Sequence, residues 1–199
     1  MDINERIRKQ FEFLQEIDKE KNIFRQTYLA DGNRKENDAE HSWHMAMMVL
    51  LMAEHSNEDI DVLKTLSMVL VHDLVEIYAG DTYAYDTAGN ESKRARELEA
   101  AEKLFNILPS DQTEYFRGLW DEFEECVTPE AKFARTADRI QPLMLNNASG
   151  GRSWKEHGVT ASMVYGRNKT TAEGSDTIWQ YADDNFIKPN IEKGTLLNN

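Results

Sequence analysis

A histidine and three carboxylates are concentrated between His72 and Asp81, directly after the apolar run 66–71. That run is typical of a buried helix, and buried ionisable groups are costly unless they are paired, hydrogen-bonded or bound to a metal. On a helix, His72 and Asp73 point about 100° apart, so a ring nitrogen and a carboxylate oxygen can reach one point in front of it. Glu76 shares their face. The stretch therefore predicts half of a first-row metal site.

His41 and Asp138 are the candidates for the other half. His41 lies near the start of an apolar helix expected from Asp38, its N-cap, to about His55. Asp138 lies inside a helix expected to begin at Thr128-Pro129, where aspartate is unfavourable. Together with His72 and Asp73 they offer two nitrogen and two oxygen ligands and leave positions open for water and substrate, as in catalytic sites. Taken singly, a buried histidine is more often a satisfied core residue, and an aspartate inside a helix can also cap, pair with an arginine or face solvent.

Nearly every other segment has helical periodicity, and no convincing strand is found. The stretch 22–37 is turn-rich and is expected to be a loop. The predicted fold class is therefore all-α, in a single domain of residues 1–199. The expected helices cover about 3–17, 38–55, 59–78, 91–108, 128–150, 154–165 and 175–189, with Pro189 ending the last one, and a further helix is expected to begin at Ser110.

The composition narrows the class of partner. The formal net charge is −13, which repels phosphate backbones and argues against a nucleic-acid polymer as partner. The start of the chain has no signal-peptide pattern and no apolar run is long enough to span a membrane, so a cytoplasmic protein is expected. The single cysteine, Cys126, follows two glutamates, a setting that disfavours a reactive thiol.

Three strings extend the pattern: residues 36–44 around His41, residues 72–81, and residues 130–139 around Asp138. In order and spacing they resemble the HD-domain metal-dependent phosphohydrolases, in particular the branch of the bacterial 5′-deoxynucleotidases and their eukaryotic relatives. The resemblance covers about residues 5–148 and implies an HD-domain helical bundle. Residues 154–189 would then form a helical C-terminal extension.

The resemblance also implies roles for individual residues. His41, His72, Asp73 and Asp138 look like ligands of one divalent metal ion (Mn, Co, Fe or Zn, with Mg as an alternative). Glu76 looks like the residue that handles the proton of the attacking water, and Asp81 like the contact to the sugar 3′-hydroxyl. Arg25 is the candidate phosphate ligand, one residue further from His41 than the family pattern has it. The deoxynucleotidases have a Trp after this Arg, where this chain has Gln26.

The implied reaction is hydrolysis of the phosphate ester of nucleoside 5′-monophosphates, deoxyribonucleotides in particular, by a homodimer. The alternatives are another HD-domain activity, such as hydrolysis of nucleoside triphosphates or alarmones, and a non-catalytic nucleotide-binding protein. Tyr83 and Tyr85 are candidates for a wall that stacks on the base. Arg167 and Lys169 rank no higher than surface charge.

Overall fold

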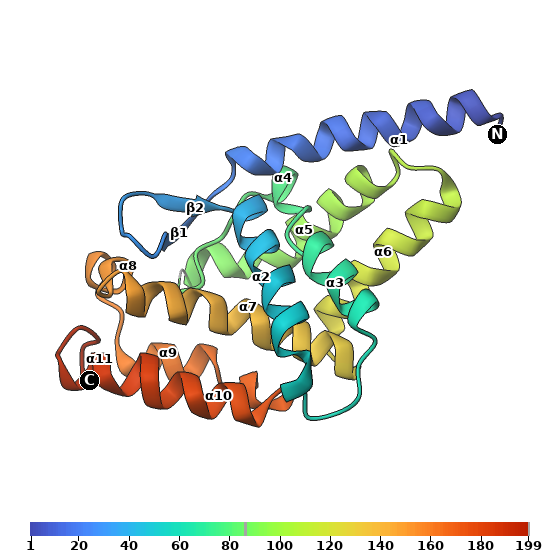
Figure 1. Cartoon of the computed structure of the whole chain (residues 1–199). Coiled ribbons are helices and arrows are strands. Elements are labelled where there is room, and N and C mark those ends of the chain that lie inside the picture. Colours follow the sequence, from blue (N-terminus) through green and yellow to red (C-terminus); the bar gives the residue numbers. More distant parts are fainter. Residues whose placement is uncertain (86, 199) are drawn as a thin grey trace.

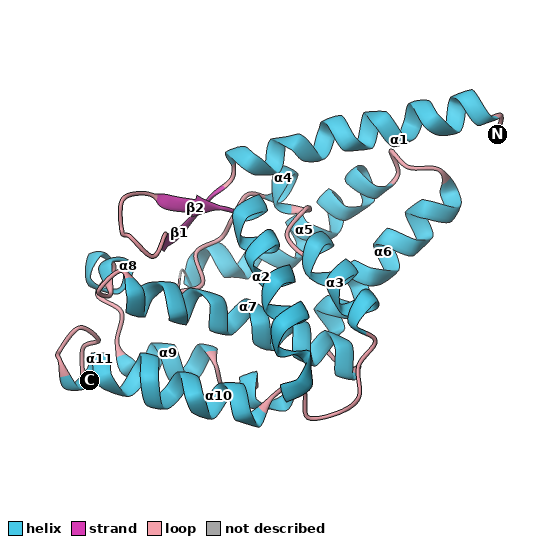
Figure 2. Cartoon of the chain, in the orientation of Figure 1, coloured by secondary structure: helices cyan, strands magenta, loops and turns pink. Residues whose placement is uncertain are grey.

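The computed structural model describes residues 1–85 and 87–198, and most of these residues are helical, which confirms the all-α class (Figures 1 and 2). The α-helices are α1 (Ile3–Ile17), α2 (Asp38–Met52), α3 (Val62–Val71), α4 (Glu76–Ala79), α5 (Thr87–Phe105), α6 (Ser110–Glu125), α7 (Pro129–Ala148), α8 (Arg152–Glu156), α9 (Ala161–Arg167), α10 (Asp176–Ala182) and α11 (Lys188–Glu192). Shorter elements are the 3₁₀ helices η1 (Asp18–Asn22), η2 (Ala53–His55) and η3 (Thr171–Glu173), and a π-helical turn, η4 (Asp183–Ile187).

Helix α7 is the central element of the fold. It crosses the middle of the molecule in Figure 1 and packs against α2, α3, α6 and α10. It begins where the sequence predicted: Pro129 is its first residue, and the side chain of Thr128 accepts a hydrogen bond from the Ala131 amide. Its apolar face meets α2 and α3 in the larger hydrophobic core, which includes Met45, Val49, Met68, Phe133, Ala134, Ala137 and Ile140.

A second hydrophobic cluster joins α5 to α6, α3 and α1. It includes Phe13, Val71, Leu104, Phe105 and Trp120, all buried. Helix α1 lies across the top of this cluster in Figure 1 and is exposed along much of its length. Leu74 and Val75, in the segment that links α3 to α4, also belong to this second cluster.

The stretch 22–37 is a hairpin, and the expectation of a loop is wrong there. Strand β1 (Phe24–Tyr28) pairs antiparallel with β2 (Lys35–Asn37). At the turn between them Gly32 has a φ of 71°, a left-handed value that favours glycine. Both strands are short and rich in polar residues, so the local sequence does not predict their pairing. The hairpin is held by its packing against α7 and α2.

Several helix ends also differ from the prediction. The N-cap of α2 is Asn37, which forms a capping box with Glu40, and Asp38 is already helical. The helix expected from 91 begins earlier, at Thr87. The region 154–165 contains two helices, α8 and α9, with Gly158 between them at a φ of 60°. Pro189 lies in the first turn of α11 and does not end a helix, because proline is tolerated there.

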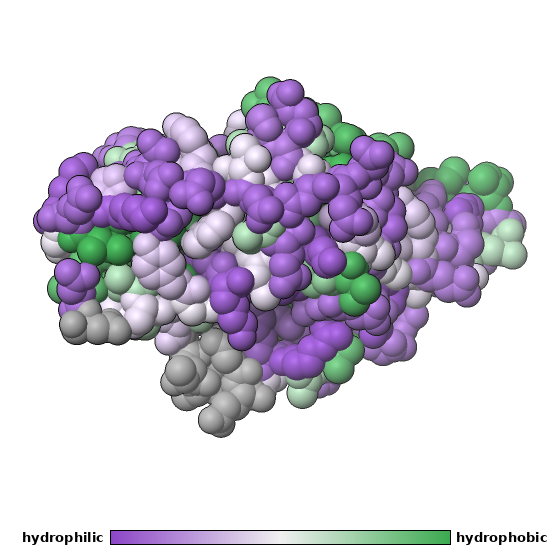
Figure 3. Space-filling view, turned by 90° about the horizontal axis from the view of Figure 1, so that it is seen from below, coloured by the Kyte–Doolittle hydropathy of each residue, from purple (hydrophilic) through white to green (hydrophobic). Residues whose placement is uncertain are grey.

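Hydrophilic side chains cover most of the face drawn in Figure 3, and hydrophobic residues form separate patches between them. Among the described residues, no helix combines the length and apolarity needed to cross a membrane.

Gly174 allows the C-terminal segment to approach α7 closely. A Cβ atom at this position would overlap the Lys132 carbonyl oxygen and Thr136 Oγ1. We expect Gly174→Ala to lower the free energy of unfolding by about 1–3 kcal/mol, as for other overpacked sites, measured by urea denaturation. The matched control is Gly166→Ala in α9, where nothing lies within 4 Å of the new methyl group. Equal stability of the two variants would contradict the close approach.

Candidate metal centre

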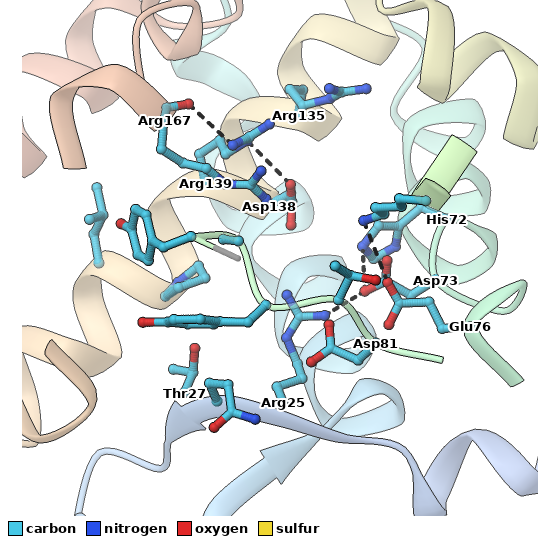
Figure 4. Close-up of a pocket in the computed structure, with 18 of the residues that line it drawn as sticks. Arg25, Thr27, His72, Asp73, Glu76, Asp81, Arg135, Asp138, Arg139 and Arg167 are labelled. Carbon is cyan, nitrogen blue, oxygen red and sulfur yellow. Dashed lines mark hydrogen bonds and ion pairs between the residues drawn. The ribbon is translucent and has the colours of Figure 1, made fainter. Parts of the chain in front are cut away.

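The sequence predicted one continuous helix through His72, but the chain is interrupted there between two helices. Helix α3 ends at Val71 and α4 begins at Glu76. In between, the backbone makes shorter-range hydrogen bonds, from the Leu74 amide to the Val71 carbonyl and from the Glu76 amide to the Asp73 carbonyl. This tighter turn directs His72, Asp73 and Glu76 into one cavity (Figure 4).

His41 and His72 approach each other from α2 and from the end of α3. Their ring centroids are 5.5 Å apart, and both side chains are buried. Nδ1 of His72 lies 2.8 Å from the Val69 carbonyl oxygen, which can only accept, so Nδ1 carries a proton and Nε2 is the ring nitrogen that faces the site. This is the usual way in which a metal-binding histidine is oriented.

The carboxylates of Asp73 and Asp138 complete the cluster. Asp73 Oδ2 lies 3.0 Å from His72 Nε2 and 4.0 Å from His41 Nε2, and these three residues can offer ligand atoms within 4.8 Å of one another. Asp138, from the middle of α7, places Oδ1 at 3.4 Å from His41 Nε2. The structure thus brings together the four residues that the sequence singled out, with Asp138 meeting the others through His41.

This donor set fits a metal ion. Nε2 of His41 and Nε2 of His72 are both buried without a hydrogen-bond partner. Such atoms are costly unless something binds them. Two imidazole nitrogens and two carboxylate oxygens suit a divalent first-row metal. The charge states suit it too: burial would raise the pKa of Asp138, but the nearby His41 ring and the Arg139 charge hold that pKa well below its usual range.

The two histidines differ in protonation. Burial and the charge of Arg25 lower the pKa of His41 to about 4. Burial acts in the same direction on His72, but the Asp73 carboxylate outweighs it and raises the pKa of His72 to about 9. Because a proton and a metal compete for the same ring nitrogen, a metal ion at this centre would displace a proton from His72.

Arg25 reaches the centre from strand β1. Its Nη1 lies 2.7 Å from Asp73 Oδ2 and 3.3 Å from Asp38 Oδ1, and its Nε lies 3.7 Å from Glu36 Oε1. The predicted phosphate ligand is therefore beside the predicted metal ligands. Gln26, the next residue, lines the same cavity and accepts a hydrogen bond from Lys35.

Glu76 is the first residue of α4, and its side chain is buried. Burial and the charge of Asp73 raise its pKa well above the usual value. Lys93 Nζ from α5 lies 3.8 Å from Glu76 Oε1 and 3.2 Å from Glu97 Oε1. The charge of Asp81 also acts on Glu76, and Asp81 faces the cavity. Glu76 and Asp81, the residues expected to handle a proton and to bind a sugar, therefore share one wall.

The remaining walls of the cavity, about 220 Å³ in volume, combine aromatic rings with cations. Tyr83 and Tyr85 both line it, with ring centroids 5.4 Å apart. Opposite Asp81 in Figure 4, Arg135, Arg139 and Arg167 gather near Asp138. Burial, with the charges of Arg167 and Arg135, lowers the pKa of Arg139 to about 10.

Sequence reasoning missed several buried residues around the centre. Glu36 lies 3.7 Å from His41 Nδ1 and accepts a hydrogen bond from Gln141 at 2.8 Å. Asp38 was interpreted as an N-cap, but it is fully buried beside Arg25. The sequence did show polar residues ahead of an apolar helix, but a helix start explains such a cluster without any buried role. Lys93 and Glu97 gave no signal, because they alternate with other charges on α5.

Glu20, in η1, supplies a test of the electrostatics around the centre. It is 8% exposed, and burial together with the charge of Asp73 raises its pKa to about 7. At pH values between the ordinary pKa of 4.5 and this raised pKa, Glu20 binds more protons in the folded protein than in the unfolded chain. The stability of the metal-free protein should therefore fall as the pH rises through this range.

We expect Glu20→Gln to remove this contribution, so that at pH 8 the metal-free variant is more stable than the wild type by about 1–3 kcal/mol. Near pH 4.5 the difference should vanish. Urea denaturation from pH 4.5 to 8 measures both. Glu99→Gln, at an exposed position of α5, is the control and should keep the wild-type pH dependence. An unchanged pH dependence in Glu20→Gln would refute the assignment.

Comparisons with known proteins identify the family and the fold. A model described as "HD domain" matches residues 17–179. The solved structure of a predicted metal-dependent phosphohydrolase from Magnetospirillum magnetotacticum is 43% identical, covers 96% of this chain and 95% of that one, and superposes with a TM-score of 0.92.

Curated relatives are similar over a shorter stretch. The 5′-deoxynucleotidase HDDC2 of Bos taurus is 33% identical over 112 residues, which is 56% of this chain and 53% of that protein. The 5′-deoxynucleotidase hdd1 of Schizosaccharomyces pombe is 30% identical over 136 residues, 66% of this chain and 67% of that protein. The chain therefore spans about half the length of the first of these relatives.

Proposed function

This chain belongs to the HD domain family, and we propose that it is a metal-dependent phosphohydrolase that hydrolyses the phosphate ester of nucleoside 5′-monophosphates, deoxyribonucleotides in particular. The observation that carries the proposal is the pair of buried, unpartnered Nε2 atoms of His41 and His72, which face two carboxylates in a cavity that also contains Arg25. The names of the similar proteins support the same reaction class.

In this proposal His41, His72, Asp73 and Asp138 hold one divalent ion, from Mn, Co, Fe or Zn, with Mg as the alternative. Such an ion, when bound, lowers the pKa of water and screens phosphate charge. Arg25, beside Asp73, is placed to bind phosphate oxygens through its planar guanidinium group. Tyr83 and Tyr85 offer rings on which a base can stack.

Glu76 takes the proton of the attacking water. Its raised pKa makes its carboxylate a stronger base, and Lys93 lies close enough to stabilise the carboxylate form. Asp81, next to it, accepts a hydrogen bond from the sugar 3′-hydroxyl. We also propose that the protein is a homodimer: Phe11, Leu14 and Leu70 are exposed and line one apolar groove between α1 and α3. A cytoplasmic location stays a prediction from the sequence.

Phosphate release tests the function directly. Purified protein treated with a chelator should be inactive, and Mn²⁺ or Co²⁺ should restore release from deoxynucleoside 5′-monophosphates. The panel includes the matching ribonucleotides, which test Gln26, and nucleoside triphosphates and alarmones, which test the other HD-domain activities. Release from none of these substrates would refute the enzyme proposal and leave the non-catalytic alternative.

The role of Glu76 requires a separate variant. Glu76→Gln should lower kcat by about 10²–10⁴-fold, the usual contribution of a general base, while the metal content by atomic absorption stays at the wild-type level. Glu97→Gln removes the same charge on the other side of Lys93 and should lower kcat far less. Loss of the metal in Glu76→Gln would show that Glu76 is a ligand instead.

A further inference from the structure

Three arginines occupy one wall of the cavity, beside the metal centre. Arg135 and Arg139 are four residues apart on α7, and Arg167 is the last residue of α9. All three line the cavity, and Figure 4 shows them on the side away from Asp81 and Glu76. Arg139 Nη1 donates a hydrogen bond to the Arg167 carbonyl oxygen at 3.1 Å. Like charges four residues apart on a helix repel each other, so this arrangement is unfavourable without an anion.

Carboxylates neutralise this wall only in part. Arg139 Nε lies 3.5 Å from Asp138 Oδ2, but Asp138 also contacts His41. Arg135 donates from Nη2 to the Phe123 carbonyl oxygen at 2.8 Å, and its Nε is buried without a partner. Among residues 1–85 and 92–198, whose side chains the structure describes, neither Arg135 nor Arg167 forms an ion pair with a carboxylate.

The other cations of the cavity contrast with these. Arg25 lies 2.7 Å from Asp73, and Lys93 lies 3.2 Å from Glu97. A chain with a net charge of −13 has many carboxylates available, yet none of those that the structure describes forms an ion pair with Arg167. The arginine wall also borders the candidate base-stacking residues, because Tyr85 is close enough to Arg167 and Arg139 for both charges to act on its hydroxyl. A bound nucleotide would therefore extend along the wall.

We propose that Arg135, Arg139 and Arg167 form a second phosphate subsite, occupied by a phosphate group that the nucleotide substrate carries in addition to the scissile one. Guanidinium groups bind phosphate through paired hydrogen bonds and remain charged when buried. The second phosphate is either on another sugar hydroxyl or attached to the first phosphate. This inference rests on the proposed function, whose substrate class it narrows.

Binding to metal-free protein tests the subsite without any turnover. The probes for titration calorimetry are deoxyadenosine 5′-monophosphate, deoxyadenosine 3′,5′-bisphosphate, deoxyadenosine 5′-diphosphate and inorganic phosphate. Wild type should bind one of the two-phosphate nucleotides more tightly than the monophosphate. Arg167→Gln should reduce this advantage by about 10-fold, as expected for the loss of one charged hydrogen bond, and Arg167→Lys should restore part of it.

Lys169→Gln is the matched control, since it removes one positive charge from an exposed position two residues away, and it should keep the advantage. The nucleotide whose advantage falls in Arg167→Gln identifies where the second phosphate is attached. No advantage in the wild type, or an advantage that Arg167→Gln leaves unchanged, overturns the proposal. So does an effect confined to inorganic phosphate.

The same variants, loaded with Mn²⁺, are then assayed for hydrolysis. The ratio of kcat/KM for the two-phosphate nucleotide to kcat/KM for the monophosphate should fall about 10-fold in Arg167→Gln, in line with binding. An equal loss for both substrates would overturn the second subsite, because the arginines would then serve the scissile phosphate. Absence of hydrolysis of every substrate would refute the proposed function, whereas calorimetry would still decide the subsite.

Discussion

The structure depends on the burial of ionisable groups at one junction of helices. Glu36, Asp38, His41, His72 and Glu76 are each at most 4% exposed, and they come from β2, α2, the end of α3 and α4. Burying this many titratable groups is costly unless each meets an opposite charge, a hydrogen bond or a metal. Arg25 lies against the carboxylates of Glu36, Asp38 and Asp73. The histidine nitrogens without a hydrogen bond define where a cation is still required.

Helix α7 connects this junction to the rest of the fold. One face contributes Phe133, Ala134 and Ile140 to the main core. The other presents Asp138 and Arg139 to the cavity. Because the same twenty residues carry both faces, the packing of the core sets the position of Asp138 relative to His41. The cavity is consequently divided into a carboxylate-rich side near Glu76 and an arginine-rich side near Arg139, a division that suits a ligand with unevenly placed negative charge.

Sequence reasoning succeeded where local signals were strong. The Thr128-Pro129 start of α7 and the helical periodicity follow from short-range chemistry. It failed where long-range packing decides. The hairpin of residues 24–37 is held by contacts with α7 and α2, and the break after Val71 interrupts a stretch whose composition favours a continuous helix. Asp38 is a further example. The local pattern predicted that it was an N-cap, but it pairs with Arg25, which lies 13 residues earlier in the chain.

By itself the sequence determined the all-α class, the four residues with the right chemistry for a metal site, and the carboxylates Glu76 and Asp81 that follow His72 and Asp73. Residue type and spacing suffice for this, because the ligand atoms that a histidine or an aspartate can offer are set by the residue type alone. Only the tertiary structure decided that His41 and Asp138 meet His72 and Asp73, that Arg25 lies against them, and that three arginines share the cavity. Such convergence depends on how α2, α3, α7 and α9 pack, and helix packing is set by many weak contacts that no short stretch of sequence contains.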